Sequence, residues 1–285
     1  VVSMTVKAYP DVTVSGATLL FQSATTTPDT FYAAVAKFHS LLPAMVDAGA
    51  MIVYYFDSTF FQIGPLTAYN KTSAEVQTIL APFVSALQGL GIQATVSYSQ
   101  DATYTAHFDR YFGPLPYGNI NIGIAQYGGR LIPRSTLETN NDNFMAVARN
   151  ITSDGVLFIG VGTDVSSQVG KVSNSVLPAW RKAIVHATLT TPWSFQAPWE
   201  EMLRLQDKMT NQIMPQIEGV TPGSGAYLNE ADFRQPNYQE VFFGENYAKL
   251  LAIKKKYDPS NLFYAIKSVG SDAWTVAADG RMCRA

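Results

Sequence analysis

The chain alternates short apolar runs with segments in which apolar residues recur every three or four positions. Successive side chains of a strand point to opposite faces, and β-branched and aromatic residues pack well on such faces, so the short runs predict β-strands. These runs lie at 1–8, 12–22, 51–58, 59–68, 92–99, 156–161 and 183–189.

Helix-start signals precede two of the periodic segments. Thr27-Pro28 combines an N-cap residue with proline at the first helical position, and Thr72 to Glu75 form a capping-box pattern. Helical spacing of apolar residues follows both signals. Further helices are predicted over 142–150 and from 198 past 209, and the two prolines and two glycines of 113–118 predict an irregular loop.

Strand pairs that alternate with helices predict an α+β fold, with an antiparallel or mixed sheet and helices on one face. We assign 10–215 to this domain. Beyond it, 216–285 carries one short strand, 226–229, and one helix over 239–256, too little to form a core of its own. We therefore expect this segment to pack on a part of the protein outside this sequence. The strand-like run at the start of the chain leads us to expect that 1–9 end a preceding domain.

Composition excludes several classes of protein. Twenty Lys and Arg residues against 22 Asp and Glu give a net charge of −2, so no basic field is available for a nucleic-acid backbone. No apolar run reaches the roughly 20 residues of a membrane helix. A single cysteine, Cys283, leaves none for a zinc cluster, and we expect no metal site.

Two Asn-x-Ser/Thr sequons lie in the chain, at Asn70 and Asn150. Such sequons are glycosylation acceptors in secreted proteins. Together with the low content of charged residues, 15%, they favour a secreted glycoprotein.

The three histidines have different surroundings in the sequence. His39 lies beside Phe38 on a periodic helix, which favours a core or surface role over catalysis. His107 lies in an aromatic stretch, 104–112, and is a candidate for a pocket or for structure. His186 shares one face of its strand with Thr188 and Thr190, and this polar stripe is either a solvated face or the wall of a pocket.

The tail carries specific motifs. Tyr227, Asn229 and Asp232 fall in a run that resembles the Tyr-x-Asn-x-x-Asp signature of berberine-bridge-enzyme-like FAD-linked oxidases, of the vanillyl-alcohol-oxidase superfamily. The runs 243–250 and 254–259 are similar to that family's C-terminal block. The closing runs 269–274 and 279–283 resemble its secreted fungal, isoamyl-alcohol-oxidase-like branch.

This resemblance implies a function for a longer protein. An N-terminal FAD-binding part, outside this sequence, would hold most of the FAD and attach it covalently, and 1–9 would be the end of that part. The whole would oxidise a hydroxylated small molecule by hydride transfer to flavin, with O2 reduced to H2O2. A flavin-free binding or scaffold protein, and a flavin dehydrogenase, are the alternatives.

The resemblance also implies site residues, with two departures from the family pattern. The fourth signature position, a tyrosine base in many relatives, is Glu230 here, either a base or a structural ion-pair partner. A carboxylate has a reference pKa of about 4.3, against roughly 10 for tyrosine, so Glu230 needs no tuning to accept a proton. Some relatives carry a catalytic glutamate near Ala187, where His186 and Thr188 are the polar substitutes.

The candidate residues fall into three groups. The catalytic candidates are Glu230, Tyr227 and His186, and strand alternation would place Tyr227 and Asn229 on one face and Glu230 on the other. Asp232 is expected to be scaffold and Asn246 to bond backbone near the cofactor. The cofactor-binding candidates are Asn229, Asn246 and Val2, and the substrate-pocket candidates are His107, Thr188 and Gln62.

Overall fold

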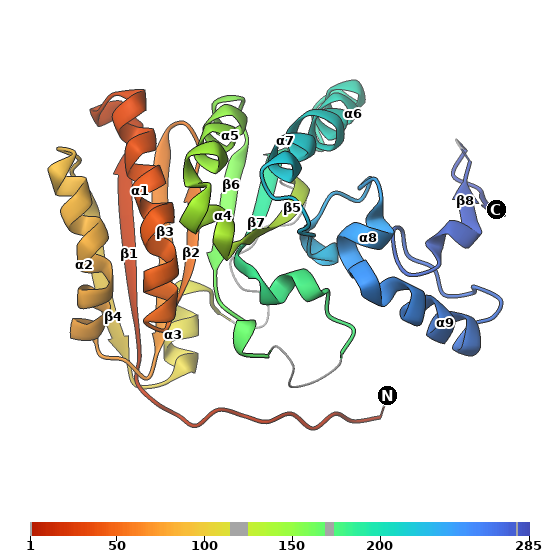
Figure 1. Ribbon diagram of the computed structural model, residues 1–285, viewed down its shortest axis with the longest axis horizontal. Helices are drawn as coiled ribbons and strands as arrows, with labels where there is room; N and C mark the ends of the chain where they lie inside the picture. Colours follow the sequence, from red (N-terminus) through yellow and green to blue (C-terminus); the bar gives the residue numbers. More distant parts are fainter. Residues whose placement is uncertain (1, 115–124, 169–173, 278) are drawn as a thin grey trace. The chain divides into compact units, whose positions relative to one another are not determined.

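The computed structural model describes residues 2–114, 125–168, 174–277 and 279–285 (Figure 1). The chain divides into two compact units, Val1–Ile122 and Gly123–Ala285, which are described one at a time. Most of the predicted irregular loop, from 115 to 118, lies outside the described residues. The predicted boundaries at 9 and 215 remain predictions.

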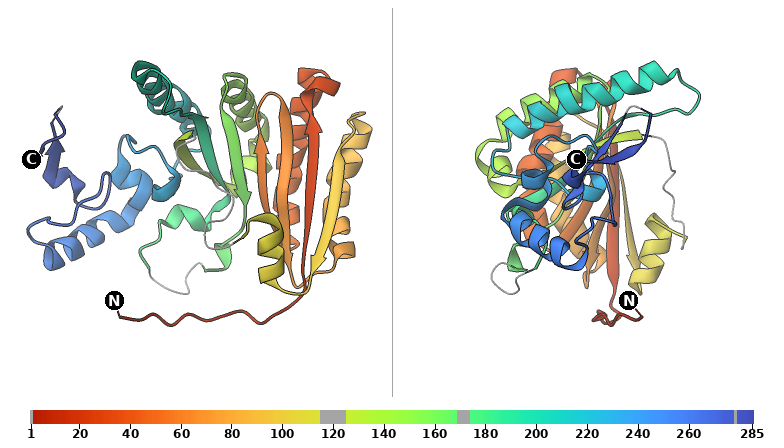
Figure 2. Two further views of the ribbon diagram at one scale, coloured as in Figure 1. Left: turned by 180° about the vertical axis from the view of Figure 1, so that it is seen from behind. Right: turned by 90° about the vertical axis from the view of Figure 1, so that its right-hand side faces the viewer.

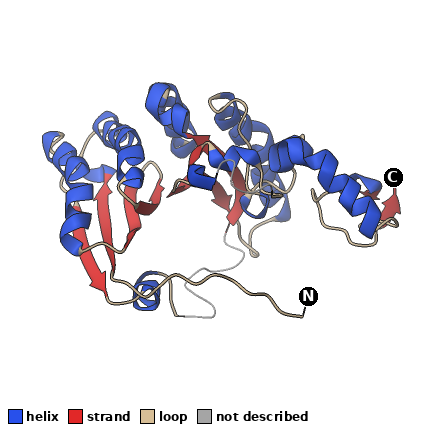
Figure 3. Cartoon of the chain, turned by 60° about the horizontal axis from the view of Figure 1, so that its bottom comes forward, coloured by secondary structure: helices blue, strands red, loops and turns tan. Residues whose placement is uncertain are grey.

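The first unit is a four-stranded antiparallel sheet in the order β4-β1-β3-β2. Helices α1 and α2 connect its strands in a βαββαβ sequence and lie in front of them in Figure 1, whereas α3 lies behind. Figure 3 shows the helices in blue gathered beside the strands in red. The elements are β1 (Val14–Gln22), α1 (Pro28–Asp47), β2 (Ala50–Phe56), β3 (Phe60–Tyr69), α2 (Ser73–Gly89), β4 (Thr95–Asp101) and α3 (Tyr104–Tyr111).

Both helix starts of this unit are confirmed. The Thr27 hydroxyl accepts a hydrogen bond from the Thr30 amide at 3.2 Å. At α2, Thr72 and Glu75 form the reciprocal capping box, with each side chain bonded to the other residue's backbone. Each cap satisfies amides that the helix cannot bond internally, so the local sequence defines where the helix begins.

Aromatic rings build the core between α1, α2 and the sheet. The Phe38 ring lies edge-on to Tyr54 at 4.7 Å and to Phe61 at 4.8 Å between centroids. His39 is completely buried in this core, and its Nε2 and Nδ1 lie 2.9 Å from the Tyr54 hydroxyl and the Val35 carbonyl oxygen. Burial lowers the pKa of His39 to about 4. His39 is therefore a neutral core residue, as the sequence favoured.

The second unit contains a three-stranded antiparallel sheet in the order β6-β7-β5. In the right-hand view of Figure 2, α6, a π-helical turn (Met209–Ile213) and α7 run as one continuous rod. The elements up to this point are β5 (Ala125–Pro133), α4 (Arg134–Thr139), α5 (Asn141–Ser153), β6 (Leu157–Gly162), β7 (Ala183–Pro192), α6 (Trp199–Lys208) and α7 (Met214–Gly219).

Strand β5 has no counterpart among the predicted strands, because the pair Gly128-Gly129 interrupts its apolar pattern. A Cβ at Gly128 would lie 2.5 Å from the Met214 sulfur and 2.6 Å from the Met209 sulfur. The glycine therefore allows the helical rod to pack directly on the strand.

Two predictions for the tail are wrong. Residues 226–229 do not form a strand. The Leu131 amide of β5 donates to the Gly225 carbonyl, and the Ala226 amide donates to the Val241 carbonyl, but the ladder does not continue because Leu228–Glu230 form a 3₁₀ turn. The helix predicted over 239–256 is broken at Gly244, whose φ of 54° ends α8 (Tyr238–Phe243). A 3₁₀ turn and α9 (Tyr247–Tyr257) follow, and β8 (Trp274–Val276) pairs with β9 (Met282–Arg284).

The strand predicted over 1–8 is also wrong for the described residues. Residues 2–13 have no regular secondary structure, and the side chains from Val2 to Asp11 are exposed. The alternating pattern is that of a strand, but a strand also requires a neighbour to bond its backbone. None of the described strands pairs with this segment.

Ionisable side chains gather in two histidine–carboxylate pairs, one in each unit: His107 with Asp101, and His186 with Glu230. No three His, Cys, Asp or Glu side chains in the described part of the chain are placed to share a metal ion. Across the same residues, no helix is both long enough and apolar enough to cross a membrane.

Candidate active site

Strand β7 places the polar stripe of the second unit. Thr188 lies opposite Gly129 of β5, and His186 lies opposite Leu131. Gly128 faces the helical rod, so its neighbour Gly129 faces the other side of the sheet, where a Cβ would lie 2.1 Å from the Glu230 carbonyl oxygen. The turn that carries Glu230 is therefore packed on the face that presents His186 and Thr188.

Glu230 lies within reach of both polar groups. The Thr188 hydroxyl donates to Glu230 Oε2 at 3.0 Å, and His186 Nδ1 lies 3.8 Å from the same oxygen. The Glu230 side chain is 49% exposed, whereas that of His186 is 7% exposed. The arrangement is an oriented carboxylate, open to solvent on one side, above a buried imidazole.

His186 is held in an aromatic setting. Its ring lies 5.3 Å from that of Trp180 and 5.5 Å from that of Tyr227. Burial lowers the pKa of His186 below its ordinary value, and the Glu230 carboxylate partly opposes this effect. The imidazole is therefore neutral at pH 7. Its Nε2 is buried and has no hydrogen-bond partner among the described residues.

Tyr227 and Asn229 meet although they do not lie on a strand. The Asn229 Nδ2 donates to the Tyr227 hydroxyl at 2.8 Å. The 3₁₀ turn beginning at Leu228 thus brings together two side chains that alternation had placed on one face. Trp180, which packs edge-on against Tyr227 at 5.7 Å, was not a candidate. It lies in a 3₁₀ turn (Pro178–Arg181) where no periodic pattern marks it.

Other candidates have defined surroundings elsewhere in this unit. Asp232 is buried and accepts hydrogen bonds from the Thr210 hydroxyl at 2.5 Å and the Arg234 amide at 2.8 Å, which is a scaffold role. The Asn246 Nδ2 donates to the Val176 carbonyl at 3.0 Å.

Val2 and Gln62 belong to the first unit. Val2 is fully exposed in the irregular N-terminal segment. Gln62 is half-buried on β3, opposite Leu20 on one neighbouring strand and Tyr55 on the other. The roles of these two residues in cofactor and substrate binding remain predictions.

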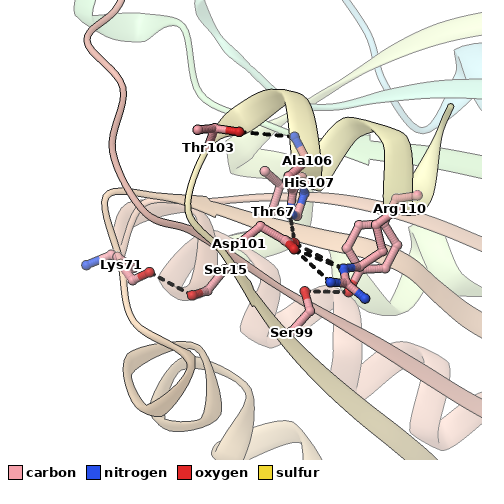
Figure 4. A network of polar contacts seen from close by, with 10 residues as sticks. Ser15, Thr67, Lys71, Ser99, Asp101, Thr103, Ala106, His107 and Arg110 are labelled. Atoms are coloured by element: carbon pink, nitrogen blue, oxygen red, sulfur yellow. Dashed lines mark hydrogen bonds and ion pairs between the residues drawn. The ribbon is translucent and has the colours of Figure 1, made fainter. Parts of the chain in front are cut away.

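His107 lies in the network of the first unit shown in Figure 4. It is completely buried, its Nε2 lies 2.9 Å from the Thr67 hydroxyl, and its Nδ1 lies 3.8 Å from Asp101 Oδ2. Arg110 donates to both Asp101 oxygens, at 2.7 and 3.0 Å. Burial lowers the pKa of His107, and Arg110 lowers that of Asp101. These contacts tie α3 to the sheet, and a pocket role for His107 remains a prediction.

The two sequons differ in their surroundings. Asn70 is exposed directly after β3, in a left-handed turn with φ of 57°. Asn150 lies inside α5 rather than in a loop, and its Nδ2 donates to Gln216 at 2.6 Å. Both residues are exposed.

Comparison with known proteins connects this site to a family. Residues 226–270 match the family model described as berberine and berberine like. The whole chain is 51% identical over 284 residues to FAD-linked oxidoreductase ZEB1 of Gibberella zeae and covers 50% of it. Over its whole length, the chain is therefore similar to berberine-bridge-enzyme-like FAD-linked oxidoreductases. It spans about half the length of the relatives it matches.

Relatives in this berberine-bridge-like family agree in fold as well as in sequence. The VAO-type flavoprotein oxidase VAO615 of Thermothelomyces thermophilus is 36% identical over 297 residues, covering all of this chain and 50% of that protein. The crystal structure of MtVAO615 from Myceliophthora thermophila superposes with a TM-score of 0.90 at 34% identity, over 96% of this chain and 50% of the other. The predicted α+β fold is therefore confirmed.

Proposed function

We propose that this chain is the substrate domain and C-terminal segment of an FAD-dependent oxidase that oxidises a hydroxyl group of a small molecule. The observation that carries the proposal is Glu230: a half-exposed carboxylate, oriented by the Thr188 hydroxyl and placed above a neutral, buried His186. A general base must combine an accessible lone pair with a fixed direction, and this carboxylate has both.

The role of the residues follows from the balance of the reaction. When bound, FAD would supply the acceptor for the hydride of the carbinol carbon, and O2 would be the final oxidant, reduced to H2O2. The hydroxyl proton of the substrate passes to a Glu230 carboxylate oxygen as the carbonyl forms. The Thr188 hydroxyl donates one hydrogen bond to Glu230 Oε2 and so fixes the direction of the carboxylate. The Tyr227 hydroxyl, oriented by Asn229, is the alternative acceptor.

The polar groups at this site are suited to make some of the contacts to FAD, but not all of them. The buried Nε2 of His186 lacks a partner among the described residues, and Asn229 is exposed beside Tyr227. We assign cofactor contacts to Asn229, Asn246 and Val2. The covalent attachment and most of the remaining contacts belong to an N-terminal FAD-binding part of the longer protein.

An exposed apolar surface supports such a partner. After α9 the chain carries large hydrophobic side chains in contact with solvent, where burial would favour an additional packed layer. Leu262 and Phe263 are each 76% exposed. We propose that this surface packs on the FAD-binding part. The full-length protein is also proposed to be secreted and glycosylated at Asn70 and Asn150.

The test is a preparation of the full-length protein. We expect an absorption band near 450 nm that survives denaturation, and H2O2 released in proportion to the alcohol consumed. Absence of the band would favour a flavin-free binding protein. A flavin that turns over with artificial acceptors but not with O2 would identify a dehydrogenase instead.

A further inference from the structure

A cavity lies next to the turn that carries Glu230. This cavity of about 270 Å³ has walls from the start of β5, the loop after β7, α6 and the residues that follow Glu230. Four of its lining side chains are aromatic: Tyr127, Trp193, Trp199 and Phe233. None of the described residues that line it is charged, so the cavity suits an uncharged, flat, apolar group.

The cavity adjoins the segment that carries the proposed base. Ala231, which lines it, directly follows Glu230 in the chain. Tyr127 shares a strand face with Gly129, the residue that packs against the Glu230 carbonyl. Tyr127 also pairs with Thr190, whereas Gly129 pairs with Thr188, the donor to Glu230. Two residues along a strand separate the two positions by about 7 Å, roughly the length of a ring and one substituent.

The aromatic rings of the cavity are held in place by their neighbours but remain partly exposed to solvent. Trp193 and Trp199 meet edge to face at 5.7 Å, and the loop between them is fixed by the Ser194 amide on the Met202 sulfur at 3.3 Å. Trp199 remains 63% exposed and Phe233 48% exposed. Aromatic rings gain most from a partner that meets them edge-on or in offset stacking, which another flat ring provides.

We propose that this cavity receives an uncharged aryl group of the substrate, so that the oxidised hydroxyl is carried on an aryl-bearing small molecule. The inference rests on the proposed function for the direction in which the hydroxyl points, toward Glu230. A saturated ring of the same size lacks the π-face that the four aromatic walls recognise, and it binds more weakly.

The experiment measures binding and turnover separately in the full-length, FAD-loaded protein. Benzyl alcohol and cyclohexylmethanol serve as probes, and quenching of tryptophan fluorescence gives the Kd of each. We expect benzyl alcohol to bind about fivefold more tightly, a factor that corresponds to about 1 kcal/mol. Trp199→Leu and Phe233→Leu should each raise the Kd of benzyl alcohol by a similar factor and leave that of cyclohexylmethanol unchanged.

Phe195→Leu is the matched control, because Phe195 is 81% exposed beside Trp193 but does not line the cavity. It should change neither Kd. Equal affinities for the two alcohols would overturn the proposal. Loss of flavin in Trp199→Leu and Phe233→Leu would also overturn it, because the rings would then be covered by another part of the protein. If the Kd pattern holds while Glu230→Gln leaves turnover intact, the aryl site stands and the assignment of Glu230 as the base fails.

Discussion

The two histidine–carboxylate pairs have the same spacing and opposite surroundings. In each pair, Nδ1 of the histidine lies 3.8 Å from a carboxylate oxygen. The Asp101 side chain is only 7% exposed and is held by three hydrogen bonds from Arg110. The Glu230 side chain is 49% exposed and accepts one hydrogen bond from Thr188.

We propose that this difference separates a structural pair, His107 with Asp101, from a reactive one, His186 with Glu230. In the first unit the charge of Asp101 is compensated and its lone pairs are occupied, so that it fastens α3 to the sheet. In the second unit the carboxylate retains free lone pairs on a solvent-facing side. The presence of a histidine beside a carboxylate therefore does not distinguish the two roles, and the compensation and accessibility of the carboxylate do.

Among the glycine substitutions that test this comparison, the largest effect is expected from Gly129→Ala. The added methyl would lie 2.1 Å from the Glu230 carbonyl oxygen, which is backbone and must move. A displacement of about 1 Å at a reacting group costs on the order of 10²-fold in rate. Turnover per bound flavin in the full-length protein should fall by this factor. Gly219→Ala, which meets nothing within 4 Å, is the control and should leave turnover unchanged.

The matching change in the first unit is Gly16→Ala. Its added methyl would lie 2.8 Å from His107 Cε1, 2.9 Å from the Tyr111 ring and 3.0 Å from a backbone oxygen. Overpacking of this kind costs roughly 1–3 kcal/mol, so the midpoint of denaturant unfolding should fall while turnover per flavin stays constant. Gly89→Ala has open space around it and should not destabilise. A loss of turnover in Gly16→Ala would show that the pair of His107 and Asp101 also serves the reaction.

Local signals in the sequence were sufficient for most of the first unit. The caps at Thr27 and Thr72 and the apolar periods after them predict α1 and α2, because the interactions that define these elements lie within a few residues. Strand β5 and the break at Gly244 were missed, because their glycines are explained by distant side chains and by a positive φ that sequence spacing does not reveal.

The candidate site was predictable in part. The signature run pointed to Tyr227, Asn229 and Glu230, and strand alternation pointed to His186 and Thr188. Trp180 and the aromatic cavity were not predicted, because their residues come from segments that only the folded chain brings together.

The smallest expected effect is the pH dependence of stability that arises from His107, the histidine of the structural pair. The pKa of His107 is lower in the folded protein than in the unfolded chain, so the unfolded chain binds more protons below about pH 6.5. Stability is therefore lost as the pH falls from 7 to 5, by at most about 1.4 kcal/mol per pH unit for each such histidine. His107→Gln should reduce this slope in denaturant titrations at the two pH values. An unchanged slope would mean that His107 does not titrate as its burial requires.

The central claim is that Glu230 is reactive and Asp101 is structural, and one paired measurement tests it. Glu230→Gln and Asp101→Asn both remove a carboxylate charge while preserving shape, and both are compared in the full-length protein for turnover per bound flavin and for thermal unfolding. We expect Glu230→Gln to lower turnover by roughly 10²- to 10⁴-fold with little change in flavin content or unfolding midpoint. Asp101→Asn should lower the midpoint and leave turnover per flavin intact. Loss of flavin or stability in Glu230→Gln, with turnover per bound flavin unchanged, would contradict the account.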